Sequence, residues 1–197
     1  MNDLYEVRNS VYCYENSNVL KNKFEIKDEK KLEEIERRVV LIKLFELRQN
    51  NQIGKFDIKH IINIHKFLFE DIYYFAGLFR RENIAKGDFC FAEWRYIENE
   101  LNKLLNKLKE ENYLNGLNKQ ELAQKLAFYM AELNVLHPFR EGNGRTIREF
   151  IRQIAYKCGY VFDIRHIEPK DMLNACIKSV IDTKDLENVI LKCLKSL

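Results

Sequence analysis

Apolar residues recur at helical spacing along most of the chain. Over residues 28–50 the apolar residues fall three or four positions apart, at Leu32, Ile35, Val39, Ile42 and Phe45. This is the period of one face of an α-helix. The patterns predict further helices over residues 57–73, 93–112, 118–136 and 144–157, one starting at Pro169, and a last one over 183–196.

One segment departs from this period. Residues 77–92 hold short apolar runs on either side of Lys86-Gly87-Asp88, which predicts a β-hairpin. The first 27 residues have no clear period, and we expect them to drape over the helices. The chain has only 7 glycines and 2 prolines, which favours long helices over a turn-rich sheet. The predicted fold is a single all-α domain, residues 1–197, with a small hairpin.

Composition narrows the classes of protein without selecting one. A chain of 197 residues with a net charge of +3 fits one globular domain and gives no general sign of a nucleic-acid or membrane partner. We expect no transmembrane helix and see no secretion signal. Five cysteines form no close pair, so reduced core thiols in a cytoplasmic protein are the preferred interpretation.

The most informative segment is the twelve residues from His137 to Arg148, HPFREGNGRTIR. Pro138 disfavours helix at His137, so the preceding helix should end there. The glycines on either side of Asn143 allow a tight turn, after which helix resumes. The start of a helix gathers backbone N–H groups and positive potential, which makes an anion site.

Charged side chains extend this anion site. Arg145 and Arg148 lie on one helix face and can reach one polyphosphate. Glu141 can hold Mg²⁺, and His137 can accept a proton near neutral pH. Each feature alone is usually a turn, a solvated face or a core histidine, but their combination favours a nucleotide-phosphate site. The spacing excludes a Walker A loop and an HExxH zinc site.

The same residues resemble a known family. They match the HxFx(D/E)GNGRxxR motif of the Fic family at every position. Upstream, Ala76-Gly77, Arg80 and residues 83–87 resemble the family's flap hairpin, placed at about 80–92, and residues 18–23 resemble its N-terminal lead-in. The resemblance therefore covers nearly the whole chain and implies a Fic-type helical bundle with the catalytic loop at 137–148.

The resemblance implies transfer of AMP from ATP to a Tyr, Ser or Thr hydroxyl of a target protein, with release of pyrophosphate. In this interpretation His137 is the base and Glu141 coordinates Mg²⁺, while Phe139 anchors the loop in the core. Lys86 and Gly87 on the flap would align the target backbone as an added strand. The residues implied in ATP and phosphate binding are Gly142, Asn143, Gly144, Arg145 and Arg148.

A second motif, Thr183 to Asn188, resembles the family's inhibitory sequence [S/T]xxxE[G/N]. In the subset with a C-terminal inhibitory helix (class III), the glutamate pairs with the second arginine of the loop. Here Glu187 would pair with Arg148 and block placement of the γ-phosphate, with Thr183 as the helix N-cap. The plain alternative is a capped, solvated C-terminal helix.

Other functions remain open on the same scaffold. The glutamate could position water for removal of AMP, or another phosphate-containing group could be transferred. Gly144 favours AMP over phosphate transfer, because phosphate-transferring relatives carry lysine at that position. A catalytically silent interaction module is the alternative from a different class. Self-modification and a homo-oligomer are further expectations left open, and the sequence names no target.

Overall fold

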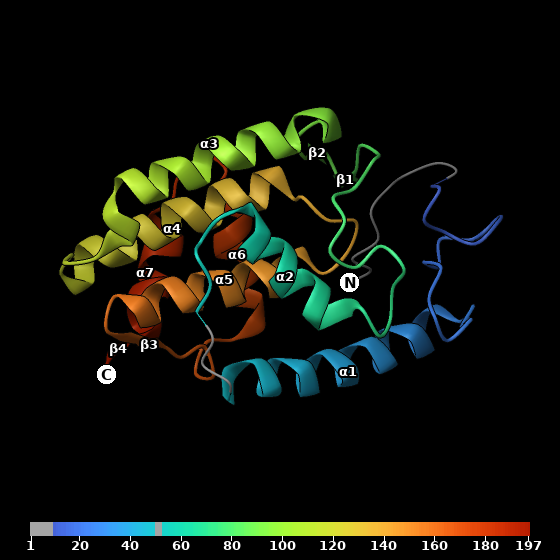
Figure 1. Ribbon diagram of the computed structural model, residues 1–197, viewed down its shortest axis with the longest axis horizontal. Helices are drawn as coiled ribbons and strands as arrows, with labels where there is room; N and C mark the ends of the chain where they lie inside the picture. The colour runs from blue at the N-terminus through green and yellow to red at the C-terminus, as the bar shows by residue number, and fades with distance from the viewer. Residues whose placement is uncertain (1–9, 50–52) are drawn as a thin grey trace.

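The structure is a computed structural model that describes residues 10–49 and 53–197. Its described part is mainly helical, as the periodicity predicts, and the helices pack around one central helix (Figure 1). The helices are α1 (Glu29–Gln49), α2 (Ile58–Phe69), α3 (Ile97–Glu110), α4 (Lys119–Leu136), α5 (Asn143–Lys157), α6 (Pro169–Lys178) and α7 (Lys184–Cys193).

Helix α4 forms the centre of the core. It packs against α3, α5, α6 and α7, so its apolar residues lie all round the helix rather than on one stripe. Leu122, Leu126, Tyr129 and Leu133 are completely buried. Its start is fixed by a capping box, in which Asn118 accepts from the Glu121 N–H and the Glu121 side chain accepts from the Asn118 N–H.

Helices α2 and α5 pack against each other beside α4. Asp57 caps the start of α2 by accepting from the His60 N–H, which satisfies one of the unpaired donors of the first turn. The ring of His60 reaches α5, where its Nε2 lies 2.9 Å from the side-chain oxygen of Gln153. Because α5 begins directly after the loop, this contact helps to fix the loop relative to α2.

Helix α1 lies on one side of the molecule, on the face opposite to α3 (Figure 1). It packs on α2, and its buried residues are Leu32, Glu36 and Val40. Residues 10–27 are irregular, with one bridge between Cys13 and Leu20. They lie against the end of α2, since the Lys23 N–H donates to the Ile72 carbonyl.

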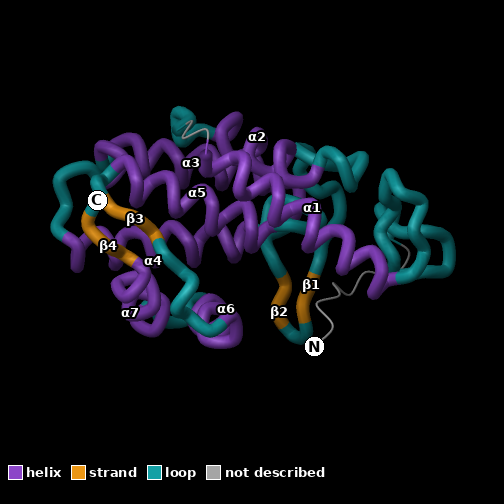
Figure 2. The backbone as a smooth tube through the Cα atoms, turned by 90° about the horizontal axis from the view of Figure 1, so that it is seen from below, coloured by secondary structure: helices purple, strands orange, loops and turns teal. Residues whose placement is uncertain are grey.

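Two short two-stranded antiparallel sheets complete the described fold (Figure 2). The predicted hairpin is confirmed as β1 (Ala85–Lys86) with β2 (Phe89–Cys90). The prediction of a last helix to residue 196 is wrong at its end. Helix α7 stops at Cys193, and β4 (Leu194–Ser196) pairs with β3 (Tyr160–Phe162). Two single 3₁₀ turns, Trp94–Tyr96 and Asn112–Leu114, flank α3.

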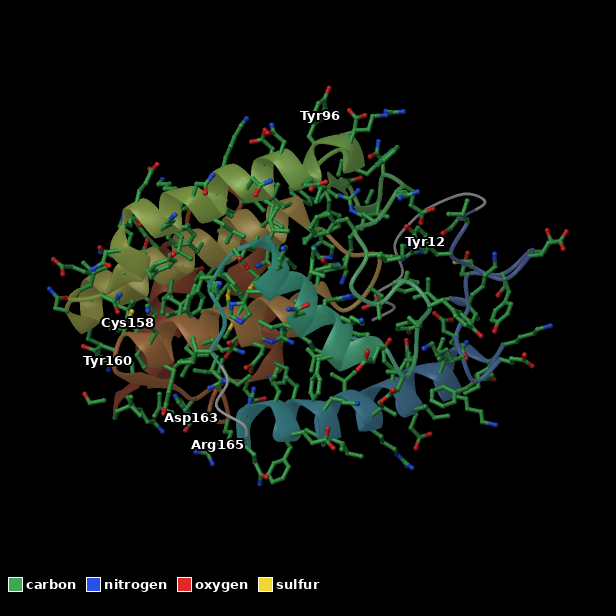
Figure 3. All side chains as sticks on the ribbon, in the orientation of Figure 1. Tyr12, Tyr96, Cys158, Tyr160, Asp163 and Arg165 are labelled. Atoms are coloured by element: carbon green, nitrogen blue, oxygen red, sulfur yellow. The ribbon has the colours of Figure 1, made fainter. Side chains whose placement is uncertain are left out.

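Asp163 lies where the chain leaves β3 and joins this sheet to neighbouring segments. It accepts from Arg165 Nε and Lys195 Nζ, each at 2.8 Å, and the two side chains hold its pKa well below the usual range. Figure 3 shows Asp163 and Arg165 near Tyr160, far from Tyr12 on the opposite side of the molecule. The described helices include none long and apolar enough to cross a membrane.

Candidate active site

The loop between α4 and α5 begins at His137, whose backbone has φ 45° and ψ 62°. Helix α4 ends at Leu136, as Pro138 predicts. The ring Nδ1–H of His137 donates to the Asn134 carbonyl at 3.1 Å, so the neutral ring carries its lone pair on Nε2. Phe91 of the flap stacks on this ring, with centroids 3.9 Å apart.

The surroundings of His137 favour its neutral form. Burial lowers its pKa to about 3, and the positive charges of Arg80 and Lys86 act in the same direction, while the bond to Asn134 opposes them. A histidine that is neutral at physiological pH is able to accept a proton. The His137 ring at the exit of α4 is therefore neutral, with its lone pair on Nε2.

Arg80 joins the flap to the end of α4. It is 1% exposed, and its Nε–H donates to the His137 carbonyl at 2.8 Å. Its two terminal nitrogens donate to the carbonyls of Glu82, Ala92 and Leu136. Because one guanidinium binds carbonyls from both segments, it holds the flap in a fixed position relative to His137.

The shape of the loop depends on Asn143 and on Phe139. The Asn143 side chain accepts from the Phe139 N–H at 2.9 Å and donates to the Phe139 carbonyl at 2.7 Å. The Phe139 ring stacks on His65 of α2, with centroids 3.8 Å apart. His65 in turn joins the Gly77 N–H to the Glu141 carbonyl. The predicted core anchor at Phe139 thus has a specific partner.

Gly142 packs against the ring of Phe69 on α2. Its φ is +80°, and a Cβ at this position would lie 2.2 Å from Cζ of Phe69. Only glycine fits both constraints. The next residues start α5, whose first N–H groups have no carbonyl one turn earlier and point toward the loop. The loop and helix start therefore have the backbone geometry on which the prediction of an anion site depends.

Glu141 lies beside this site. One carboxylate oxygen accepts from the Gly142 N–H at 2.8 Å and lies 3.5 Å from Nη2 of Arg145. Burial and the nearby Glu36 raise the pKa of Glu141. Arg145 also donates to Glu36 at 2.5 Å, and its guanidinium lies over the Phe69 ring at 4.9 Å.

Arg148 folds back toward the start of α5. Its Nη1 is 3.1 Å from where a Cβ on Gly144 would be, so Gly144 leaves space for this guanidinium. Burial and the like charges of Arg145 and Arg48 lower the pKa of Arg148. A guanidinium that is desolvated among like charges gains from a bound anion.

The predicted ion pair between Glu187 and Arg148 is not formed in the described part of the chain. Glu187 instead accepts from the Thr183 hydroxyl at 2.6 Å. Thr183 does occupy the N-cap position of α7, but its side chain accepts no hydrogen bond from the backbone N–H groups of the first turn. Asn188 is exposed on α7. The three residues of the predicted inhibitory motif thus lie on the helix start without contacting the loop arginine.

The flap carries Lys86 and Gly87 at its turn. Lys86 pairs with Phe89 across the hairpin. Gly87 has φ +57°, and a Cβ added to it would have no other atom within 4 Å. The positive charge of Lys86 acts on His137, so the hairpin lies beside the base. An open depression borders the hairpin, lined by Asn83, Ile84, Ala85, Cys90, Phe91 and Glu93.

Sequence reasoning missed four contributors to this site: Glu36, His65, Tyr73 and the carbonyl of Asn134. Tyr73 donates to Glu36 and follows α2. The signal for Glu36 was present, because it falls four residues after Leu32 and four before Val40 on the buried stripe of α1. The other three are identified only by contacts across the fold.

With the geometry established, known proteins give an independent comparison. The sequence pattern of the Fic/DOC family matches residues 55–155. The protein adenylyltransferase VbhT of Bartonella schoenbuchensis is 40% identical over 188 residues, covering 95% of this chain and 39% of that protein. The probable protein adenylyltransferase y4lH of Sinorhizobium fredii is 36% identical over 85% of this chain and 86% of its own length.

A solved structure agrees in fold. The crystal structure of the Bartonella tribocorum effector BepC with bound AMPPNP superposes with a TM-score of 0.90 at 28% identity, covering 94% of this chain and 97% of that one. The chain thus spans nearly all of one solved relative but well under half of VbhT.

Proposed function

This chain belongs to the Fic/DOC family, and we propose that it is a protein adenylyltransferase that moves AMP from ATP to a hydroxyl of a target protein. The observation that carries the proposal is the placement of a neutral histidine, His137, in the same loop as the N-terminus of α5 and two arginines. Relatives named protein adenylyltransferase and a relative with bound AMPPNP support it.

The steps follow from the geometry of the loop. His137 Nε2 takes the proton of the target hydroxyl as that oxygen attacks the α-phosphorus of ATP. The bond from the α-phosphorus to the bridging oxygen breaks, and pyrophosphate leaves. The first N–H groups of α5, with Arg145 and Arg148, stabilise the charge on the phosphates. Phe91 restricts water around the base by covering the ring.

The residues present fit Mg²⁺. Glu141 offers a hard oxygen donor whose pKa is raised by burial and by Glu36, so a cation at this carboxylate relieves a desolvated charge. Mg²⁺ commonly takes one or two protein carboxylates together with substrate phosphates. The described residues hold no cluster of three or more acidic, histidine or cysteine side chains fit to bind a metal. When bound with ATP, Mg²⁺ would neutralise charge on the α- and β-phosphates.

The flap supplies the target site in this proposal. A segment of the target would add to the hairpin edge next to Lys86 and Gly87, with its hydroxyl directed at His137. The support is the hairpin itself, its contact with His137 through Phe91, and the depression along it. Labelling with ATP identifies the target and shows whether the chain modifies itself.

The central test uses ATP labelled at the α- or the γ-phosphate, with a cell lysate as the source of targets. We expect label on protein from α-labelled ATP alone, and none with His137→Ala. General-base assistance contributes about 10²–10⁴-fold, so the variant should label below detection while still binding ATP. Label from γ-labelled ATP would indicate phosphate transfer, and loss of label from a pre-labelled target would indicate AMP removal. ATP binding without any transfer would indicate a silent module.

We also propose that α7 inhibits the transfer of AMP, which requires Glu187 to move from its position in this structure. Glu187 would have to leave the Thr183 hydroxyl and approach Arg148, since these two form no ion pair here. Glu187→Gly tests it in the same assay, with exposed Asp185→Gly on the same helix as the control. A strong rise in labelling for Glu187→Gly alone would support inhibition, and equal labelling by wild type and variant would remove it.

A further inference from the structure

Helix α1 sends one carboxylate into the site from outside residues 55–155. Glu36 is 8% exposed, although it stands in an acidic stretch that otherwise faces solvent. Both of its oxygens are bound: one accepts from Arg145 Nη2 at 2.5 Å, and the other accepts from the Tyr73 hydroxyl. Burying a carboxylate is costly unless such partners satisfy it, so the two contacts define where Glu36 must lie.

Arg145 is fixed by three groups. Its Nη2 binds Glu36, the same nitrogen lies 3.5 Å from Glu141, and the plane covers the Phe69 ring. Within residues 10–49 and 53–197, no protein acceptor is bonded to its Nε or Nη1. One edge of the guanidinium is therefore held by α1, and the other donors remain for a ligand oxygen. A guanidinium held in this way loses less freedom when it binds a phosphate.

We propose that Glu36 and Tyr73 are positioning residues for nucleotide binding: they fix the guanidinium of Arg145 so that it meets the phosphates of ATP. The proposal rests on the proposed function of the loop. Of the two carboxylates near Arg145, Glu36 lies nearer and is outside the loop. Glu36 holds the guanidinium of Arg145, so Glu141 is left to bind Mg²⁺ and the Gly142 N–H. Tyr73 keeps the carboxylate of Glu36 in place.

A purely electrostatic role predicts the opposite sign. Glu36 carries a negative charge close to the proposed place of a polyanion, so neutralising it would tighten ATP binding by Coulomb's law. Positioning predicts weaker binding, because the neutral side chain no longer holds Arg145 with a charge-assisted bond. The direction of the change in ATP affinity therefore separates the two roles.

The experiment measures the dissociation constant of ATP by calorimetry, with Mg²⁺ and again with the metal chelated, for full-length variants. We expect Glu36→Gln to weaken ATP binding about tenfold in both conditions, from loss of a charge-assisted bond. Tyr73→Phe should weaken it about threefold, from loss of one neutral bond. Glu34→Gln is the matched control, since Glu34 pairs with Arg38 on the exposed face of the same helix, and its constant should equal that of the wild type.

Each outcome decides the proposal. Glu36→Gln that unfolds cooperatively yet binds ATP as tightly as the wild type, or more tightly, overturns it. If Glu36→Gln does not fold, Tyr73→Phe decides, because it keeps the charge pair and removes one hydroxyl; an unchanged constant then overturns the proposal. A double-mutant cycle with Arg145→Lys should show non-additive losses, and additive losses contradict positioning. If neither the wild type nor Glu187→Gly labels any protein although both bind ATP, the proposed function alone is overturned.

Discussion

At the scale of single residues, the loop divides its work between chemistry and shape. His137, Glu141 and the arginines carry a charge or a lone pair. The side-chain amide of Asn143 instead uses both its oxygen and its nitrogen in hydrogen bonds to the backbone of Phe139. Gly142 is the other shape residue, with φ +80° and the Phe69 ring directly beneath it. Asn143 and Gly142 thus hold the backbone of the loop in its shape, although they belong to a motif that looks chemical in sequence.

Replacement of Gly142 tests this division. Gly142→Ala places a Cβ against Phe69 in the left-handed region, and we expect it to lower the free energy of unfolding by about 3 kcal/mol, as overpacking and backbone strain add. Gly116→Ala is the control, because Gly116 has φ +87° with nothing within 4 Å, and it should cost only about 1 kcal/mol. Urea unfolding measures both, and equal losses would show that contact with Phe69 is unimportant.

At the scale of elements, local patterns predicted most of the fold. Apolar spacing placed α1, α2 and α5, because each buries a stripe that the sequence shows, and the long apolar segment from Leu122 to Leu136 placed α4. The hairpin followed from the turn around Gly87. The end of the last helix did not follow, because Leu194–Ser196 becomes a strand only through its partner Tyr160–Phe162. A pairing between segments so distant in sequence leaves no trace in a local period.

The site shows the same limit at the level of contacts. The loop from His137 to Arg148 is contiguous, so its chemistry could be predicted as a unit. The burial of Glu36 could be predicted from its place between Leu32 and Val40, but its partner could not, since Arg145 lies 109 residues later in the chain. The pair of Glu187 with Arg148 was predicted from a motif, yet Glu187 bonds to Thr183, four residues earlier. Motif residues identify candidates, and only the fold decides which of them meet.

At the scale of the whole molecule, α1 and the core act on one site. Among the residues that the structure describes, three ion pairs join α1 to later segments: Glu36 with Arg145, Lys43 with Asp71, and Arg48 with Glu149. Two of these end on α5, the helix whose start is the proposed anion site. Helix α1 is therefore attached to α5 through charges as well as packed on α2.

This attachment predicts that nucleotide binding stabilises α1 from a distance. ATP on Arg145 restrains its partner Glu36, and local opening of α1 then also releases the bound arginine, so exchange of α1 amides near Glu36 should slow several-fold on saturation with Mg²⁺ and ATP. Amides of α3, on the opposite side of the molecule (Figure 1), serve as the internal control and should keep their rates. In Glu36→Gln, at ATP levels that also saturate the variant, the slowing in α1 should disappear. Equal slowing in both proteins, measured by hydrogen exchange with mass spectrometry, would show that α1 senses the nucleotide by a route other than Glu36.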